Sequence, residues 1–163
     1  MNKMPLTVTS SAFEQDGKIP SRFTCEGNNA SPPLSWSGAP SDTKTFALIV
    51  DDPDAPDPEK PQRVYVHWVA YNIPGNTTEL QEDASRKGLP GNAPHGRNDW
   101  DKRQFGGPCP PIGRHRYFHK IYALDTELSF AAPPTKDDLL KEMKGHILAQ
   151  GELMGTYQKG DPK

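Results

Sequence analysis

Short apolar runs separated by turn residues dominate the hydrophobic pattern of the chain. Runs of about four to eight residues that are rich in β-branched and aromatic side chains favour strands over helices. Glycine, proline, asparagine and aspartate stand between the runs and predict turns. The pattern predicts strands over residues 6–10, 34–36, 45–50, 64–73 and 115–125.

Two of these runs predict the centre of a sheet. Residues 45–50 are continuously apolar and predict a buried strand that ends at Asp51-Asp52-Pro53, followed by a proline-containing loop over 54–61. The run 64–73 is apolar on both faces, which is typical of a strand covered on both sides. Strict alternation places Val64, Val66, Trp68 and Ala70 on one face of this strand. It places Tyr65, His67, Val69 and Tyr71 on the other face.

Helical spacing occurs in one region, near the C-terminus. Thr135 is a favourable N-cap, with Asp137 and Asp138 in the first turn. An apolar stripe follows at Leu139, Leu140, Met143, Ile147 and Leu148, and Gly151 is a plausible helix stop. The pattern therefore predicts a helix that starts after Thr135 and reaches the region of Gly151, with 152–158 as a last extended segment.

The long segment 79–103 is polar and rich in turn residues. A loop of that length inside a compact domain is usually functional or disordered. The predicted strands lack the helical crossovers that parallel pairing needs, so antiparallel pairing is expected. With 163 residues, 18 prolines and 14 glycines, we expect one loop-rich, mainly β domain over 1–163 with a C-terminal helix.

The charge balance excludes some classes of partner. A formal net charge of −2 gives no electrostatic case for binding nucleic acid or an anionic membrane, and no apolar run approaches the roughly 20 residues of a membrane span. The N-terminal residues show no signal-peptide core, which predicts a cytoplasmic protein. Cys25 and Cys109 fit no metal-binding spacing, so two reduced thiols are expected, although a single bridge is compatible with the sequence.

Candidate chemistry centres on residues 115–125. As a strand, this run places His115, Tyr117, His119 and Ile121 on one face, directly after the turn-rich run 106–113. Asp51, Asp52 and Asp54 follow one buried strand, and His67 lies inside another. Each feature alone has an ordinary structural explanation, namely a solvated turn, a hydrogen-bonded core histidine or amphipathic side chains at a sheet edge.

Together these residues form a set of donors with one acceptor. Histidine and tyrosine side chains and loop N–H groups suit an oxyanion such as phosphate, sulfate or carboxylate. Asp52 could fix a histidine tautomer or accept a hydrogen bond from a protonated phosphate oxygen. No cofactor motif is present. Two weaker alternatives are a metal site of His67, His115, His119 and Asp52, and a Cys109 nucleophile beside His115.

Several motifs resemble the phosphatidylethanolamine-binding protein family, which includes the Raf kinase inhibitor protein, and in particular its bacterial and archaeal branch. The resemblance covers nearly the whole chain. It is carried by Asp52-Pro53-Asp54-Ala55-Pro56, His67-Trp68, Asn98-Asp99-Trp100, Gly107-Pro108-Cys109-Pro110-Pro111, His115-Arg116-Tyr117 and the tail Gly145 to Tyr157.

The resemblance implies a large antiparallel sheet packed on a smaller one, with a small anion pocket near the surface. It implies that ligand-binding residues are Asp52, His67, Cys109, Pro111, His115 and Tyr117. Asp54 and Arg116 match positions that pair to brace the loops, and His119 is expected to be structural.

We therefore expect a non-enzymatic, regulatory protein that binds a phosphate or phosphoryl headgroup, without metal or cofactor. One alternative is an inhibitor of a kinase or protease acting through the surface of residues 79–103. The other is a hydrolase with His67 or His115 as general base, although it lacks an evident nucleophile. Homodimerisation is compatible with the bacterial branch of the family.

Overall fold

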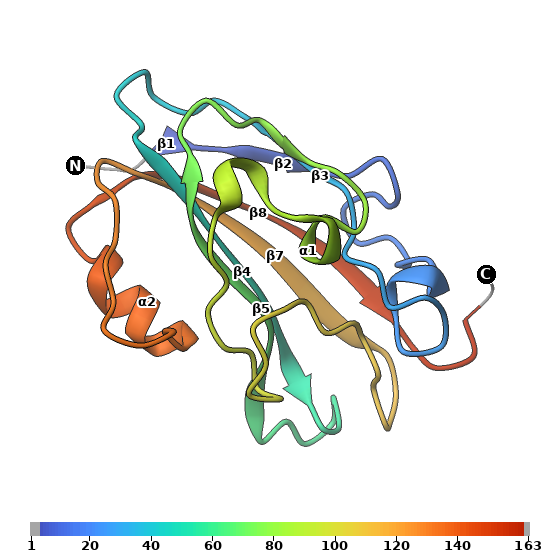
Figure 1. Cartoon of the computed structure of the whole chain (residues 1–163). Coiled ribbons are helices and arrows are strands. Elements are labelled where there is room, and N and C mark those ends of the chain that lie inside the picture. Colours follow the sequence, from blue (N-terminus) through green and yellow to red (C-terminus); the bar gives the residue numbers. More distant parts are fainter. Residues whose placement is uncertain (1–3, 162–163) are drawn as a thin grey trace.

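The computed structural model describes residues 4–161 and contains two β-sheets. The larger sheet has the strand order β1-β8-β7-β4-β5, and the smaller sheet has the order β2-β3-β6 (Figure 1). The large-sheet strands are β1 (Met4–Pro5), β4 (Thr45–Ala55), β5 (Arg63–Pro74), β7 (His115–Leu124) and β8 (Ile147–Tyr157). The small-sheet strands are β2 (Thr7–Thr9), β3 (Leu34–Ser37) and β6 (Glu79–Leu80).

The pairing is antiparallel throughout, except for the short parallel contact between β1 and β8. This confirms the mainly β, two-sheet fold and the antiparallel pairing. The helical elements are α1 (Ala84–Lys87), α2 (Lys136–Met143) and 3₁₀ turns at Ser21–Phe23 and Pro90–Asn92. The segment 79–103 is thus structured, because it contains β6, α1 and a 3₁₀ turn. Among the described residues, no helix is long and apolar enough to cross a bilayer.

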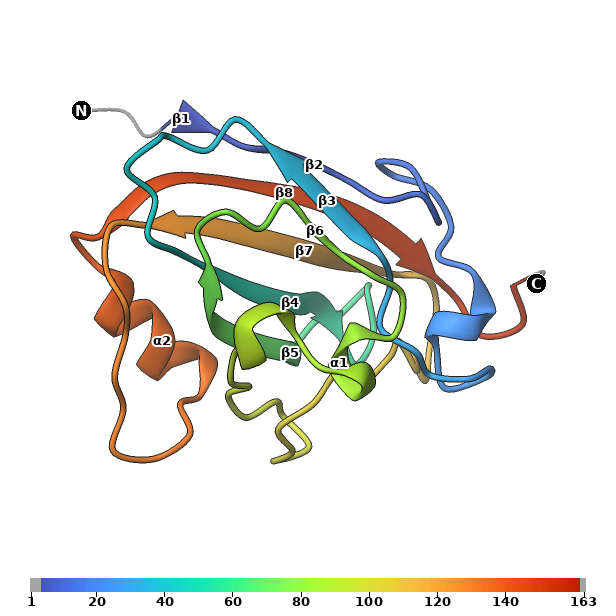
Figure 2. The same ribbon diagram turned by 45° about the horizontal axis from the view of Figure 1, so that its top comes forward.

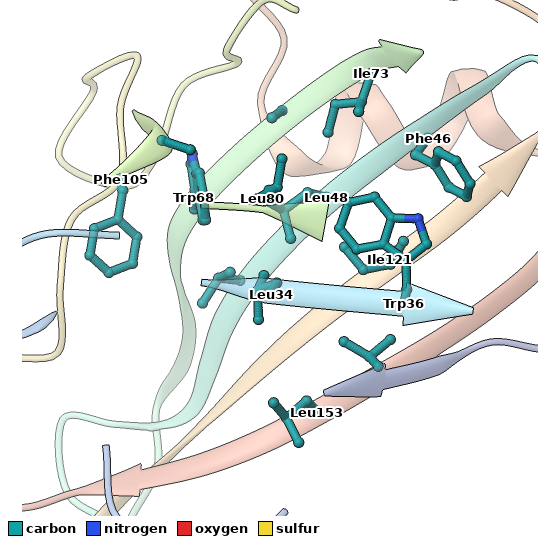
Figure 3. Close-up of a cluster of buried hydrophobic side chains, with 14 of the residues drawn as sticks. Leu34, Trp36, Phe46, Leu48, Trp68, Ile73, Leu80, Phe105, Ile121 and Leu153 are labelled. Atoms are coloured by element: carbon teal, nitrogen blue, oxygen red, sulfur yellow. The ribbon is translucent and has the colours of Figure 1, made fainter. Parts of the chain in front are cut away.

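The main hydrophobic core lies between the two sheets. Figure 3 shows Leu34 and Trp36 of β3 beside Leu48 of β4 and Ile121 of β7. A second core covers the opposite face of the large sheet, where Leu139 and Met143 of α2 pack with apolar residues of β4 and β5. Figure 2 shows the small sheet over the large one, with α2 set to one side. Strands β4 and β5 are therefore buried on both faces over most of their length, as the apolar runs predict, whereas one face of β7 stays partly exposed.

The C-terminal helix is shorter than the apolar stripe predicts. Thr135 forms a capping box with Asp138, as expected for an N-cap, but α2 ends at Met143. Gly145 adopts a φ of +84°, which ends the helix, and the chain continues as strand β8. Gly151, predicted to stop the helix, lies inside β8, where a side chain would overlap the backbone of Leu6. The last extended segment is confirmed, but it begins earlier than predicted.

Strand β4 extends beyond its predicted end. The expected stop at Asp51 was wrong, because the strand continues to Ala55. Asp51 accepts from Lys120 Nζ at 3.0 Å and Lys136 Nζ at 2.8 Å, on one face of the sheet. Asp52 points to the other face and contacts His115. Two consecutive carboxylates can stay in a buried strand because each is hydrogen-bonded on its own face.

Candidate ligand pocket

A cavity of about 440 Å³ opens where the end of β4 meets the starts of β5 and β7. These strand ends lie in the lower part of Figure 1. Two loops complete its wall, one carrying Trp100 and one carrying residues 109–111. The lining residues are Asp52, Ala55, Pro56, Gln62, Arg63, Tyr65, His67, Trp100, Cys109, Pro110, Pro111, His115 and Tyr117. All six predicted ligand-binding residues thus line one cavity.

A β-bulge in β5 directs His67 into this cavity. Val50 of β4 pairs with Trp68, but the next residue, Asp51, pairs with Val66, so His67 is an extra residue between them. The predicted strict alternation of β5 is therefore wrong. Trp68 and the cavity-lining His67 lie toward the core between the sheets, whereas Val66 packs into the second core. The bulge realigns one side chain to serve the cavity.

His67 is held as a neutral ring with a defined tautomer. Its Nδ1 lies 2.7 Å from the carbonyl oxygen of Gly106, which can only accept, so Nδ1 carries the hydrogen. The Gly106 N–H donates back to the His67 carbonyl oxygen at 2.9 Å. Burial lowers the pKa of His67 to about 4. Nε2 therefore has a free lone pair at neutral pH, and within residues 4–161 no group bonds to it.

Three aromatic rings surround His67. The centroids of Tyr65, Trp100 and Tyr117 lie 5.5, 5.0 and 5.2 Å from that of the imidazole, each in an edge-to-face arrangement. Trp100 is 41% exposed and forms the outer wall. Gly106 lies behind Trp100, where any side chain would overlap the indole. The aromatic wall is thus packed on its inner side and open toward solvent.

Asp52 and His115 form a second polar pair in the cavity. His115 Nδ1 lies 2.6 Å from Asp52 Oδ2, and Nε2 lies 2.9 Å and 3.1 Å from the carbonyl oxygens of Ile112 and Pro56. Because those carbonyls only accept, Nε2 must carry a hydrogen, and one further proton is shared between Nδ1 and the carboxylate. Burial raises the pKa of Asp52, and the hydrogen bond from His115 opposes that shift.

This geometry refines the role expected of His115. Both of its nitrogens are engaged by the protein, so the ring lines the cavity without a free donor. Its hydrogen bonds instead connect Asp52 to the loop at Ile112. Tyr117 stacks on His115 with centroids 6.4 Å apart. Burial, reinforced by the charge of Asp52, raises the pKa of Tyr117, so its hydroxyl keeps its proton.

Charged residues brace the strands and loops around the cavity. Arg116 donates to Asp54 from Nε at 3.0 Å, from Nη2 at 2.9 Å and from its backbone N–H at 2.9 Å, which is the pairing that the resemblance implies. Burial alone would raise the Asp54 pKa, but these hydrogen bonds hold it below its usual value. At the mouth, Arg63 pairs with Asp99 at 2.9 Å and stacks on Tyr65.

The two cysteines are bonded to each other. Cys25 and Cys109 form a disulfide across 84 residues of sequence, with their Cα atoms 5.4 Å apart. The expectation of two reduced thiols was therefore wrong, since distant sequence positions give no sign of spatial contact. A bonded sulfur is not a nucleophile, which also removes the Cys109 alternative in this state. Cys109 and Pro111 nevertheless lie at the cavity, as the resemblance implies.

The alternative metal site does not assemble. Across residues 4–161, no group of three or more histidine, cysteine or acidic side chains is arranged to hold a metal ion. His119 lies deeper along β7, where its Nδ1 lies 3.1 Å from the carbonyl oxygens of Tyr117 and Leu153. Burial lowers its pKa to about 4, as for His67. His119 does not line the cavity, in keeping with a structural role.

Comparison with known proteins establishes the family. A model of the phosphatidylethanolamine-binding protein family matches residues 9–158. The chain belongs to this family. A UPF0098 protein of the archaeon Methanothermobacter thermautotrophicus is 46% identical over 156 residues, which cover 95% of this chain and all of that protein. A UPF0098 protein of Aquifex aeolicus is 40% identical over 158 residues, covering 94% of this chain and 89% of its own length.

Solved structures of phosphatidylethanolamine-binding proteins share the fold. The homologue from Chlamydia trachomatis superposes with a TM-score of 0.86 at 40% identity, covering 95% of this chain and 98% of its own. E. coli YbcL superposes with a TM-score of 0.84 at 35% identity, covering 94% and 98%. These similarities confirm the resemblance and its bacterial and archaeal character.

Seven of the lining residues were not among the predicted ligand-binding residues, and three of these, Arg63, Tyr65 and Trp100, form the aromatic wall and the mouth. Trp100 belongs to a motif that carries the family resemblance, but nothing local to it indicates a cavity. Tyr65 was placed on the same face as His67, and their shared alternation is the signal that could have identified it. Arg63 precedes the predicted strand and gives no signal, because its place at the mouth depends on the loop that brings Asp99 to it.

Proposed function

We propose that this member of the phosphatidylethanolamine-binding family binds small ligands that carry a phosphoryl group, as a non-enzymatic regulatory protein. One observation carries the proposal. The cavity offers the neutral Nε2 of His67 as an acceptor, while the Tyr117 hydroxyl and the Arg63 guanidinium at the mouth can donate. A phosphoryl group that retains one proton matches both requirements, because it has acceptor oxygens and one O–H donor.

The proton distinguishes among oxyanions. A fully deprotonated oxyanion has only acceptors, so one of its oxygens would face the His67 lone pair without a hydrogen between them. Binding therefore requires one proton, either on the ligand or on Nε2 of His67. The Asp52–His115 pair supplies no net charge to offset this requirement, since it holds one shared proton. We expect phosphate to bind better than sulfate, which carries no proton at neutral pH.

The volume of the cavity leaves room for more than a phosphoryl group. At about 440 Å³ it can also hold part of an organic substituent, which would lie against the aromatic wall of Tyr65 and Trp100. A small phosphorylated headgroup such as phosphoethanolamine fits that description. The aromatic wall supplies apolar contact, and the inner end of the cavity supplies the hydrogen bonds.

Isothermal titration with inorganic phosphate, phosphoethanolamine and sulfate tests the proposal. Both phosphates are expected to bind, and sulfate to bind at least tenfold more weakly. The second pKa of a phosphate monoester is about 6. Above that value the required proton must be taken up, so affinity is expected to fall by up to tenfold per pH unit between pH 7 and 8. Equal binding of sulfate and phosphate, or no binding of either phosphate, would contradict the proposal.

The chemistry of the same cavity supports a non-enzymatic role. The sulfur of Cys109 is bonded, and the two imidazoles are held by backbone carbonyls. A water molecule activated by His67 is the chemistry that a hydrolase would need, and the low pKa of about 4 makes this imidazole a weak base. Release of nitrophenol from nitrophenyl phosphate or acetate at a rate lost in His67→Phe would contradict the non-enzymatic role.

We also propose that the protein acts in the cytoplasm.

A further inference from the structure

The disulfide connects an exposed loop to the rim of the ligand pocket. Cys25 is exposed and follows the 3₁₀ turn at Ser21–Phe23. Its partner, Cys109, is half-buried and lines the cavity. A chemical change at Cys25 is therefore transmitted by one covalent bond to the pocket wall.

The two segments are also held together without the disulfide. The Cys25 N–H donates to the carbonyl oxygen of Pro108 at 3.0 Å, and the Gly107 N–H donates to Asn29 Oδ1 at 2.9 Å. Gly107 packs so closely on the backbone of Phe23 that no side chain would fit. Opening the bridge would leave these contacts in place and the two sulfurs near each other. These contacts keep Cys25 and Cys109 close to each other independently of the bridge.

The bridge fixes one end of the pocket rim. The loop from Cys109 to His115 contains Pro111 and Ile112, which are exposed and have little packing of their own. The Ile112 carbonyl oxygen accepts from His115 Nε2 at 2.9 Å. With the disulfide closed, the loop is anchored at Cys109 and in β7. With it open, the first anchor is reduced to the backbone contacts of Gly107 and Pro108.

We propose that Cys25–Cys109 is a reversible thiol–disulfide site that regulates ligand binding, with the oxidised form binding more tightly. The proposal rests on the proposed function of the pocket. Fixing the rim in advance lowers the entropy lost on binding, which favours the closed form. In a reducing cytoplasm, disulfides are usually transient and serve catalysis or redox sensing. A disulfide at a pocket wall suits redox sensing.

The reductant is a thiol of the glutathione or dithiol class. Its thiolate attacks Sγ of the exposed Cys25, forming a mixed disulfide and releasing the Cys109 thiolate, which takes up a proton. A second thiol then attacks the mixed disulfide and releases Cys25. In total, two electrons and two protons pass from two thiols to the protein, and the reductant leaves as its own disulfide.

Ligand titration of the oxidised and reduced protein tests the proposal. The native protein is treated with dithiothreitol without denaturant, and free thiols are counted by maleimide labelling and mass spectrometry. Phosphoethanolamine is then titrated into both forms. The reduced form is expected to bind on the order of threefold to tenfold more weakly, and reoxidation is expected to restore the affinity. A Cys25→Ser variant should bind like the reduced form, whether or not dithiothreitol is present.

Several outcomes would overturn the redox proposal. One is equal affinity of the oxidised and reduced forms. Another is a bridge that opens only after unfolding, or that does not form in air-oxidised protein. If phosphoethanolamine binds neither form, the proposed function fails, and the amide resonances of Ile112 and Gly113 still decide the redox coupling. These amide resonances are expected to shift when the disulfide is reduced, and unchanged resonances would contradict a coupling between the disulfide and the pocket rim. If Cys25→Ser does not fold, reduced wild-type protein gives the result.

Discussion

Two buried histidines on the large sheet show how little burial alone says about a binding site. His67 and His119 are 3% and 2% exposed, and burial lowers the pKa of each to about 4. Each has Nδ1 at a backbone carbonyl oxygen. His67 lines a cavity, whereas the His119 ring packs near Phe13, with centroids 5.2 Å apart.

The difference between the two histidines arises from the backbone. His119 lies in regular pairing between β4 and β8, whereas His67 is the extra residue of a bulge. The bulge turns an ordinary buried histidine toward the cavity with its Nε2 lone pair free. A perturbed pKa therefore marks both residues, and only the geometry separates the candidate ligand-binding one from the structural one.

The largest expected effect is one that both histidines share. An unfolded chain takes up protons near pH 6.5, whereas these folded imidazoles resist protonation until about pH 4. The free energy of unfolding should therefore fall as the pH drops from about 6.5 to 4, by about 3 kcal/mol for each histidine. Urea unfolding at pH 7, 5.5 and 4.5 measures this. His119→Phe should weaken the dependence, and a pH-independent stability would contradict the assigned neutral state.

Asp51 and Asp52 lie on opposite faces of β4, and their substitutions are expected to differ in their effect on stability. Asp51→Asn leaves Lys120 and Lys136 without their shared carboxylate, at positions that are 26% and 19% exposed. We expect a loss of about 2–4 kcal/mol in the free energy of unfolding, with phosphate affinity unchanged. In Asp52→Asn the amide can still hydrogen-bond to His115 Nδ1, so the free energy of unfolding should fall by no more than about 1 kcal/mol. Chemical denaturation of both variants measures these losses. A larger loss of stability in Asp52→Asn than in Asp51→Asn would contradict this expectation.

Removing the ring nitrogens from each histidine separates binding from stability. His67→Phe and His119→Phe keep an aromatic ring of similar size and should each lose about 1–2 kcal/mol of stability with their hydrogen bonds. Only His67→Phe should lose phosphate affinity, by at least tenfold. Calorimetric titration with inorganic phosphate measures both variants. An equal loss of affinity in His119→Phe would show that the effect passes through the fold rather than through the pocket.

The smallest expected effect concerns the outer wall. Trp100→Ala should weaken phosphoethanolamine binding by about threefold while leaving inorganic phosphate unchanged, because Trp100 contacts only the organic part in our proposal. Trp100→Phe is the matched control and should retain most of the affinity. Because more than half of Trp100 is buried against Tyr65 and His67, Trp100→Ala should also lower the free energy of unfolding by about 1–3 kcal/mol, whereas Trp100→Phe should lose less. A parallel loss for inorganic phosphate would place Trp100 in the inner site.

The sequence predicts the fold where periodicity is regular. Strand β7 alternates without interruption from His115 to Ala123, and its buried face is the predicted one. The complementary donor and acceptor chemistry of Asp52, His67 and His115 suggests one site, and the family resemblance implies it; periodicity alone does neither. The pairing of Asp54 with Arg116 also follows from the resemblance.

Three structural features cannot be predicted from the periodicity of the sequence. The bulge at His67 depends on how β5 pairs with β4, which the sequence of β5 alone does not reveal. Ile147 and Leu148 match a helical stripe, but tertiary pairing with β7 overrides that local preference. The disulfide joins residues 84 positions apart and depends on the folded loops. In each case, contacts distant in sequence decide the structure.

In our proposal, His67 Nε2 faces the ligand, whereas His119 does not contact it. Nitrogen-15 NMR of the histidine side chains tests it directly during titration with phosphoethanolamine. We expect a saturable shift of the His67 Nε2 resonance, toward the protonated or hydrogen-bonded range, with the His119 resonances unchanged. An unmoved His67 resonance at saturating ligand would contradict the claim.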